Sequence, residues 1–463
     1  MVGTATQEIA YEAQPGTPQE LMIACPYEDV FFGGARGGGK TFGMLGDWIS
    51  HADLYGKDAR GLFLRRTLDE LDEVWDICAQ ILPLLGYVPK VQKRAFVSAD
   101  GAVLKMRYLD RDEDAEKYQG HSYTWLCFEE LTNWPDPKPI DKLLATLRSA
   151  VGVPTYFRAT GNPGGVGHNW VKARYIDPSP PWIPFTDPAT GRQRVFIPAT
   201  LDDNPVLLKN DPDYWKRVEA SASGNNELLK AWRHGIWDIV AGGMFDDLWR
   251  RDVHVIEPFE IPESWYVDRS FDWGSSKPFS VGFWAESDGT KAPNGRTYPR
   301  GTLFRISEWY GWSGRPNEGC KLLSDEIARG IKEREENLDL AAGLTVKPGP
   351  ADSSIFDTED GPSIADKMAE CGVRWEHADK SPGSRKNGWE RLRMMLKAAL
   401  SFPMEEPGLF VFNTCTDGFI RTVPVLPRDK KKTDDVDSNA EDHTGDEVRY
   451  RVMARIAREW KMY

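Results

Sequence analysis

The sequence predicts an α/β protein built from two domains in tandem. Its 463 residues exceed the usual size of one hydrophobic core, so two domains of roughly 200 residues each are expected. In the first half, short apolar runs alternate with helical stretches, which is typical of a mainly parallel sheet with crossover helices. In the second half, three strand-like runs indicate an antiparallel meander, and helical periods follow it, which predicts a mixed α/β domain.

The strand-like runs mark the sheets, and turn residues mark the domain boundary. The runs are residues 30–32, 61–64, 103–108, 123–128 and 156–159 in the first half, and 265–273, 280–285 and 303–310 in the second. A polar helical stretch ends near residue 238, and two glycines and the proline-punctuated EPFEIPESW follow it. We therefore expect a first domain over 1–240 with a helical lid from about 200 to 240, a linker over 241–261, and a second domain over 262–463.

Composition excludes several classes of protein. Hydrophobic residues make up 40% of the chain, charged residues 28%, and no apolar run approaches the ~20 residues that span a bilayer. The N-terminus lacks the basic-then-apolar pattern of a signal peptide. Six scattered cysteines without zinc spacing predict reduced thiols rather than a metal site or disulfides. A net charge of −13 means that any contact with DNA is local.

The strongest motif is GARGGGKT, which runs from Gly34 to Thr41 between a strand and a helix. Its spacing is that of a phosphate-binding loop. Glycines let backbone N–H groups surround phosphate oxygens, Lys40 supplies a charge near the β and γ phosphates, and the Thr41 hydroxyl can ligate Mg²⁺. The alternative is a glycine-rich turn with a chance lysine, which the strand-loop-helix setting disfavours. The expected phosphate-binding residues are Gly34, Gly37, Gly38, Gly39, Lys40 and Thr41, and the family resemblance described below adds Arg36.

Two later strand ends carry polar residues suited to the same site. YTWLCFEE ends in Glu129, expected on the metal side, and Glu130, expected to activate water. YFRATGNPGG places Thr160 and Asn162 at a strand tip, where they can hydrogen-bond a γ phosphate. The alternatives are that the two glutamates only cap a buried strand, and that TGNP is a plain β-turn.

Acids of the second half are dispersed in the way that a two-metal phosphodiesterase requires. Asp272 ends the first strand of that half, Asp352 lies in PGPADSS, and Asp446 lies at the start of the last helical period. Asp442 lies four residues before Asp446, so both project from one helix face, next to His443. The alternative is that Asp437 and Asp442 are helix-cap residues, and that Asp272 and Asp352 are ordinary surface acids.

The order GGARGGGKT, LCFEEL, ATGNPGG, then FDWG, ADSS and EDHTGDEVRY resembles the large terminase subunits of tailed double-stranded DNA bacteriophages. The resemblance covers nearly the whole chain. It implies a P-loop ATPase domain followed by a ribonuclease H-like nuclease domain. Family members usually carry Asp where this chain has Glu129, which is one methylene longer.

The resemblance also implies site residues. Glu129 would hold the metal of the ATPase site, Glu130 would be its base, and Thr160 and Asn162 would couple hydrolysis to movement. Gln19 is similar to the glutamine that reads adenine in related motors. Metal ligands of the nuclease would be Asp272, Asp352 and Asp446, with Asp437, Asp442 and His443 as auxiliary candidates. The arginine finger stays open among Arg107, Arg111 and Arg148.

By the same resemblance, the chain would hydrolyse ATP with Mg²⁺ to move double-stranded DNA through a portal, and would cut DNA with Mg²⁺ or Mn²⁺. Partners would be the portal protein, a small terminase subunit and further copies in a ring, in the host cytoplasm, with no membrane. Lys380, Arg385, Lys386 and the run 428–432 are the basic residues expected to contact DNA, unless they lie in solvated loops. The alternatives are a P-loop translocase or helicase whose second half binds DNA without cutting, and a non-catalytic ATP switch.

Overall fold

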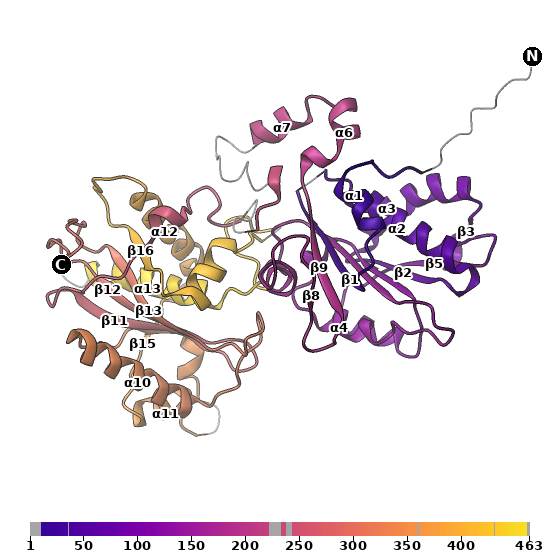
Figure 1. Ribbon diagram of the computed structural model, residues 1–463. Helices are drawn as coiled ribbons and strands as arrows, with labels where there is room; N and C mark the ends of the chain where they lie inside the picture. Colours follow the sequence, from indigo (N-terminus) through magenta and orange to yellow (C-terminus); the bar gives the residue numbers. More distant parts are fainter. Residues whose placement is uncertain are drawn as a thin grey trace, which may run out of the picture. The chain divides into compact units, whose positions relative to one another are not determined.

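The computed structural model divides the chain into two compact units, Met1–Ala241 and Gly242–Tyr463, called here the N-terminal and C-terminal units (Figure 1). Each unit has its own hydrophobic core. The structure describes residues 11–35, 37–221, 233–237, 243–358, 361–429 and 431–460. Within these residues, no helix is both long and apolar enough to cross a bilayer.

The N-terminal unit is built on a nine-stranded sheet with the order β3-β4-β5-β2-β6-β7-β1-β9-β8. The six strands from β5 to β9 in this order are all parallel to their neighbours, and β3, β4 and β8 add antiparallel edges. The strands are β1 Asp29–Gly34, β2 Arg60–Arg65, β3 Val88–Lys90, β4 Ala95–Val97, β5 Val103–Tyr108, β6 Trp125–Phe128, β7 Tyr156–Gly161, β8 Phe185–Thr186 and β9 Gln193–Ala199. All five expected strand positions are therefore confirmed, and β9 is an addition that the sequence analysis missed.

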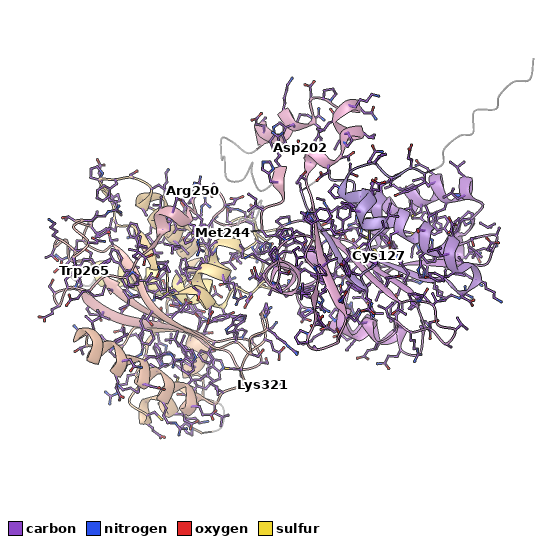
Figure 2. All side chains as sticks on the ribbon, in the orientation of Figure 1. Cys127, Asp202, Met244, Arg250, Trp265 and Lys321 are labelled. Carbon is purple, nitrogen blue, oxygen red and sulfur yellow. The ribbon has the colours of Figure 1, made fainter. Side chains whose placement is uncertain are left out.

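Helices cover both faces of this sheet because its central strands are apolar on both faces, as in β6, whose four residues are all buried. α1, α2 and α3 pack on one core, and α4 and α5 on the other (Figure 1). Cys127 on β6 lies inside the first core (Figure 2). The helices are α1 Pro18–Ile23, α2 Lys40–Tyr55, α3 Leu68–Ile81, α4 Lys138–Leu144, α5 His168–Val171, α6 Pro205–Asn210 and α7 Tyr214–Ser221.

The C-terminal unit contains a seven-stranded sheet with the order β10-β16-β13-β12-β11-β14-β15. β11, β12 and β13 form the predicted antiparallel meander, and β14, β15 and β16 join it in parallel. The order β13-β12-β11-β14-β15 is that of a ribonuclease H-like fold. The strands are β10 Val255–Ile256, β11 Tyr266–Asp272, β12 Ser280–Glu286, β13 Leu303–Tyr310, β14 Pro350–Ala351, β15 Glu376–His377 and β16 Leu409–Phe412.

Helices cover both faces of this second sheet as well. α10 and α11 lie on one face, and α12 and α13 lie on the other (Figure 1). The helices are α9 Arg251–His254, α10 Ser324–Ala342, α11 Ile364–Glu370, α12 Ser384–Ala399 and α13 His443–Trp460. All six cysteines of the chain are free thiols, as expected.

The segment expected as a linker, residues 241–261, behaves differently in its described part. Met244 and Phe245 are buried in the core of the C-terminal unit, and β10 pairs with β16. Residues 241 and 242 lie outside the described residues. The apolar side chains of MFDDLW therefore add to the second core, although the surrounding glycines and prolines read as a connection.

Candidate functional sites

The phosphate-binding loop lies between β1 and α2, as the motif predicts. Gly37 and Gly39 have φ values of 77° and 72°, which favour glycine, and Gly39 is the residue before α2. A Cβ on Gly34 would lie 2.2 Å from the Ala199 carbonyl oxygen on β9, so no larger residue fits there. Gly38 completes the loop, and the predicted Arg36 lies outside the described residues.

Lys40 and Thr41 begin α2 and face the ends of the neighbouring strands. The Lys40 Nζ donates to the Ala35 carbonyl oxygen at 2.6 Å and to Asn162 Oδ1 at 2.8 Å. The Thr41 hydroxyl donates to Glu129 Oε1. The structure thus joins the two residues that the sequence analysis assigned to the metal of the nucleotide site.

Glu129 follows β6 and is almost fully buried. Burial raises the pKa of its carboxyl, and the nearby Arg65 guanidinium is the largest opposing influence. The Arg65 Nε lies 3.1 Å from Glu129 Oε2. This ion pair favours the ionised carboxylate, which is the form that binds a metal.

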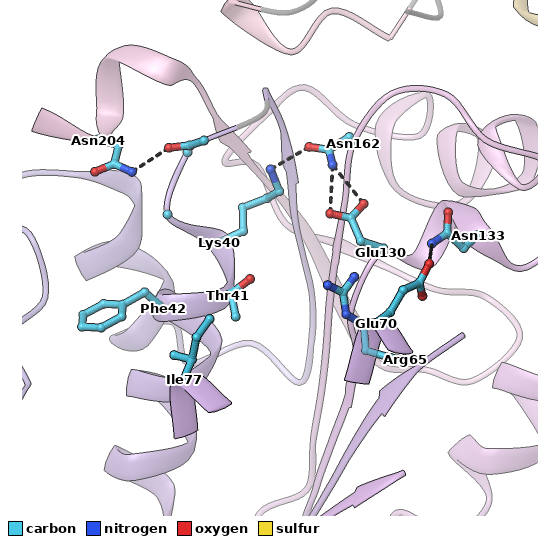
Figure 3. A pocket seen from close by; sticks show the side chains of 13 residues that line it. Lys40, Thr41, Phe42, Arg65, Glu70, Ile77, Glu130, Asn133, Asn162 and Asn204 are labelled. Carbon is cyan, nitrogen blue, oxygen red and sulfur yellow. Dashed lines mark hydrogen bonds between the residues drawn. The ribbon is translucent and has the colours of Figure 1, made fainter. Parts of the chain in front are cut away.

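Glu130 and Asn162 meet at the adjacent ends of β6 and β7 (Figure 3). The Asn162 Nδ2 lies 2.9 Å from each oxygen of the Glu130 carboxylate. Glu130 has a left-handed backbone with φ of 57°, and its N–H donates to the Thr160 hydroxyl at 3.2 Å. Asn162 therefore links the expected base to Lys40 through the two ends of one amide.

A cavity of about 610 Å³ opens above these residues. This volume lies in the range of ligand pockets. Its wall contains glycines of the loop, the start of α2, and polar side chains from β2, α3 and the strand ends (Figure 3). The lining residues are Gly37, Gly38, Gly39, Lys40, Thr41, Phe42, Arg65, Glu70, Ile77, Glu130, Asn133, Asn162 and Asn204.

Gln19 is buried beside the loop rather than in the cavity wall. Its Nε2 donates to the Gly39 carbonyl oxygen at 3.1 Å, and its Oε1 accepts from the Gln14 N–H at 2.9 Å. Both ends of the amide thus hold backbone here. The role of Gln19 in reading adenine stays a prediction.

Several residues that line this site were missed by the sequence analysis, among them Arg65 and Asn204. Arg65 ends β2, next to β6, and a search for polar residues at every strand end would have found it. Asn204 donates from Nδ2 to the Gly37 carbonyl oxygen at 2.7 Å, and its Oδ1 caps α6 by accepting from the Leu207 N–H. Asn204 had no local signal, because only the fold brings it to the loop.

The three arginine-finger candidates lie away from the cavity wall. Arg107 on β5 donates to the Arg94 and Met106 carbonyl oxygens. Arg148 donates to Ser122 Oγ and the Gly120 carbonyl oxygen. Arg111 precedes a 3₁₀ turn, and its backbone N–H donates to Asp114 Oδ2 at 3.2 Å. None of them completes the site of its own chain, and the assignment stays open.

The second predicted site lies where β11 and β14 end side by side. Asp272 is the last residue of β11, and the Asp352 N–H donates to the Phe271 carbonyl oxygen at 3.0 Å. The two aspartates thus stand at one edge of the sheet. From α13, the Tyr450 hydroxyl donates to Asp272 Oδ1 at 3.2 Å, and His443 Nδ1 lies 3.3 Å from Asp272 Oδ2.

The acids of this edge influence one another electrostatically. Burial raises the pKa of Asp272 to about 6, and Asp446 and Asp352 add to this increase. Burial also raises the pKa of the Tyr450 hydroxyl, to which Asp272, Asp446 and Asp352 contribute in that order. For Asp442, burial and then Asp446 raise the pKa to about 7. The structure therefore gathers the negative charge of all three predicted metal ligands around Tyr450.

Basic side chains hold two of these acids. Lys380 Nζ lies 2.5 Å from Asp352 Oδ1. The Arg385 guanidinium donates to both oxygens of Asp446, at 2.8 and 3.0 Å, and to Asp442 Oδ2 at 3.2 Å. Within the residues that the structure describes, no three His, Cys, Asp or Glu side chains come close enough to hold a metal ion. As they stand, the acids do not form a metal-ligand set.

The remaining predicted residues are placed around this edge. Asp437 accepts from the N–H and Nδ2 of Asn439 in a local turn that precedes α13, so it does not cap that helix. Lys386 pairs with Asp434 at 2.6 Å. Arg428 donates to the Gly243 and Thr433 carbonyl oxygens, so it supports a loop.

Buried ion pairs hold α13 to the sheet and hold the segment before α13 to a neighbouring turn, and the sequence analysis missed them. Glu447, next to Asp446, accepts from Arg305 Nη1 at 2.5 Å. Arg451 donates to Asp268 Oδ1 at 2.7 Å from the same helix. Glu441, before the helix, pairs with Arg421 at 2.7 Å. Together these pairs determine which face of α13 meets β11 and therefore where Asp446 lies.

The first unit is thus a P-loop nucleotide-binding domain, and the second has a ribonuclease H-like fold. Residues 31–252 match the family model described as terminase large subunit, T4likevirus-type, N-terminal. The N-terminal unit therefore matches the N-terminal part of the large terminase subunits. No curated protein matches the chain.

Solved structures of bacteriophage terminases are similar to this chain. The large terminase of a thermophilic bacteriophage in complex with ADP has a TM-score of 0.40 and 17% identity, over 94% of this chain and 98% of that one. The HK97 bacteriophage large terminase has a TM-score of 0.43 and 10% identity, over 94% and 93%. The P22 large terminase nuclease domain has a TM-score of 0.34 and 17% identity, over 47% and 93%.

Proposed function

We propose that the N-terminal unit hydrolyses ATP to drive double-stranded DNA through a portal, and that the C-terminal unit cuts the DNA with a divalent metal. The observation that carries the ATPase proposal is the meeting of Lys40, Glu130 and Asn162 at one cavity that the P-loop lines. A phosphate-binding loop binds nucleotide, and an acid at the next strand end supplies the base for hydrolysis.

Each residue of the nucleotide site has a distinct task. The loop N–H groups at the start of α2 cradle the phosphates, and Lys40 neutralises charge that develops on them. Glu130 takes the proton of the attacking water. Thr41 and Glu129, which already contact each other, would hold Mg²⁺, and the ion would offset phosphate charge.

Asn162 is the proposed coupling residue. It hydrogen-bonds Glu130 through Nδ2 and Lys40 through Oδ1. Binding or loss of a phosphate at Lys40 would therefore alter the hydrogen bond between Asn162 and the proposed base, Glu130. Thr160, on the same strand end, accepts from the Glu130 N–H. Loss of the γ phosphate would then alter the hydrogen bonds at the end of β7.

For the C-terminal unit, the adjacent strand ends that carry Asp272 and Asp352, and the contact of Asp272 with Tyr450 of α13, support a nuclease site that uses Mg²⁺ or Mn²⁺. A second candidate function is a DNA-binding unit that does not cut. The pairing of Lys380 with Asp352 and of Arg385 with Asp446 favours that alternative, because the acids are occupied by cations of the chain itself.

The partners and the compartment belong to the same proposal. The family of the N-terminal unit supports a portal protein, a small terminase subunit and a ring of further copies as partners, in the host cytoplasm. Gln19 is proposed to contact adenine after rearrangement of its backbone contacts, and an arginine from a neighbouring copy is proposed to complete the ATP site.

Two variants of the full chain separate the activities. Glu130→Gln should abolish phosphate release from ATP and leave plasmid cleavage with Mn²⁺ intact, whereas Asp272→Asn should do the reverse. Exposed acids of the same units, changed in Glu113→Gln and Asp252→Asn, are matched controls. Unchanged ATP hydrolysis by Glu130→Gln would reject the motor, and absence of metal-dependent cleavage by the unmodified chain would favour the non-cutting alternative.

A further inference from the structure

Arg65 is a charged residue of the cavity wall to which no motif gives a role. It ends β2, and Leu64 pairs in parallel with Phe128 of β6, so Arg65 reaches the sheet edge beside Glu129. Its side chain is 12% exposed and lines the cavity together with Lys40 and Glu130. In Figure 3 its guanidinium lies beside Glu130, on the side of the cavity opposite Phe42.

The Arg65 Nε forms an ion pair, and the two terminal nitrogens have no partner among the described residues. The Nε lies 3.1 Å from Glu129 Oε2, whose carboxylate is 2% exposed. Within the described part of the chain, the terminal nitrogens Nη1 and Nη2 make no hydrogen bond, and they are not among the buried atoms that lack one. Arg65 therefore presents unused N–H donors and positive charge at a phosphate-binding cavity.

A guanidinium with free terminal nitrogens is suited to a phosphate group. It offers two parallel N–H donors, which match two phosphate oxygens, and it stays charged at any physiological pH. Lys40 already divides its contacts between Ala35 and Asn162, so the cavity gains a second cation from Arg65. The bound group is therefore an anion rather than the base or sugar of a nucleotide.

The position of Arg65 indicates which phosphate. The inner phosphates of a nucleotide lie in the loop at the start of α2, and the attacking water lies near the base, on the far side of the last phosphate. Arg65 stands on the side of Glu129 and Glu130 rather than in the loop. We propose that Arg65 binds the terminal phosphate of the triphosphate within its own chain and distinguishes ATP from ADP; this rests on the proposed ATPase function.

Because Arg65 also pairs with Glu129, its role could instead be to position that glutamate, and this alternative can be tested. If Arg65 only positioned Glu129, its loss would disturb the metal side of the site, and the Mg²⁺ concentration needed for binding would rise for ATP analogues and ADP alike. If Arg65 binds the terminal phosphate, only the triphosphate suffers. The distinction is therefore a ratio of two affinities, which general damage to the cavity leaves unchanged.

The experiment measures displacement of a fluorescent ADP from the full chain by AMP-PNP and by ADP, at several Mg²⁺ concentrations. Arg65→Gln should weaken AMP-PNP binding about tenfold or more and ADP binding less than about twofold, and Arg65→Lys should lie between them. Arg60→Gln is the matched control, because Arg60 begins the same strand and donates to the Gly101 carbonyl oxygen instead. Far-ultraviolet circular dichroism checks folding.

The proposal for Arg65 would be overturned if Arg65→Gln weakened the binding of AMP-PNP and ADP equally, or weakened the binding of neither. Restoration of AMP-PNP binding to Arg65→Gln by extra Mg²⁺ would assign it to positioning of Glu129 instead. The experiment measures binding, so its result is independent of hydrolysis. If the unmodified chain distinguishes the two nucleotides but does not hydrolyse ATP, the proposed ATPase function is rejected and the proposed role of Arg65 remains.

Discussion

Replacing Glu447 by glutamine should loosen α13 from the sheet of the C-terminal unit. Glu447 and Arg305 are both fully buried, and the Arg305 Nη1 lies 2.5 Å from Glu447 Oε2. The same carboxylate accepts from Ser280 Oγ at 3.2 Å and from Trp284 Nε1 at 3.1 Å. Glutamine keeps the shape of the side chain but removes its charge and turns one acceptor into a donor.

The expected loss follows from these contacts. Breaking a buried ion pair by changing one partner costs about 3–5 kcal/mol, because the other charge is left in a medium of low dielectric constant. Arg305 retains a second carboxylate, Glu308, at 3.0 Å, so the lower end applies and we expect about 3 kcal/mol. For a domain of this size, that corresponds to a decrease of roughly 6–12 °C in Tm.

The assay is differential scanning calorimetry of the full chain, with Glu390→Gln as the control. Glu390 is an exposed residue of α12 in the same unit, so its change should stay within about 0.5 kcal/mol. The double variant Glu447→Gln with Arg305→Met should lose less than the sum of its single changes, since it removes both charges. A loss under about 1 kcal/mol for Glu447→Gln, or strict additivity, would refute the reasoning.

Three further predictions follow from other sites. Asn162→Ala should lower kcat for ATP about tenfold or more while nucleotide affinity changes little, because the Glu130 carboxylate loses both contacts; an unchanged kcat would contradict its role. Arg385→Gln should lower the Mn²⁺ concentration for half-maximal thermal stabilisation about tenfold, because the guanidinium competes for Asp446, and an equal or higher concentration would exclude competition. Burial, aided by Arg158, lowers the pKa of His51 to about 4. Below about pH 6.5 the His51 imidazole takes up a proton in the unfolded chain but not in the folded chain, so the free energy of unfolding falls by up to about 3 kcal/mol between pH 6.5 and 4. Urea titrations should show a weaker pH dependence of stability for His51→Gln. An identical pH dependence would reject the shift.

The nucleotide site was largely predictable because its chemistry is local. GARGGGKT combines its glycines, lysine and threonine in one turn, and the following acids occur directly after apolar runs. Parallel strands end at the same edge of a sheet, so polar residues after such runs are expected to meet. Arg65 was not predicted because it ends its strand without a recognisable motif. Asn204 was not predicted because only the fold brings it to Gly37.

The acids of the second unit show the limit of this reasoning. Family order and spacing predicted Asp272, Asp352 and Asp446 as metal ligands, and the structure places Asp272 and Asp352 at adjacent strand ends. Nothing in the order of residues, however, predicts that Lys380 and Arg385 hold two of them. That pairing depends on how the loop before α12 folds over the edge, which is a matter of three-dimensional packing.

By itself, the amino-acid sequence predicted that the chain is α/β, that a P-loop motif lies between a strand and a helix of its first half, and that carboxylates end its strands. Short segments determine these properties, because turn geometry and hydrophobic periodicity depend on a few neighbouring residues. The tertiary structure alone decided that residues 244–261 belong to the second core, and that Glu447 faces Arg305. Such contacts join residues far apart in the chain, and their energies depend on burial that exists only after folding.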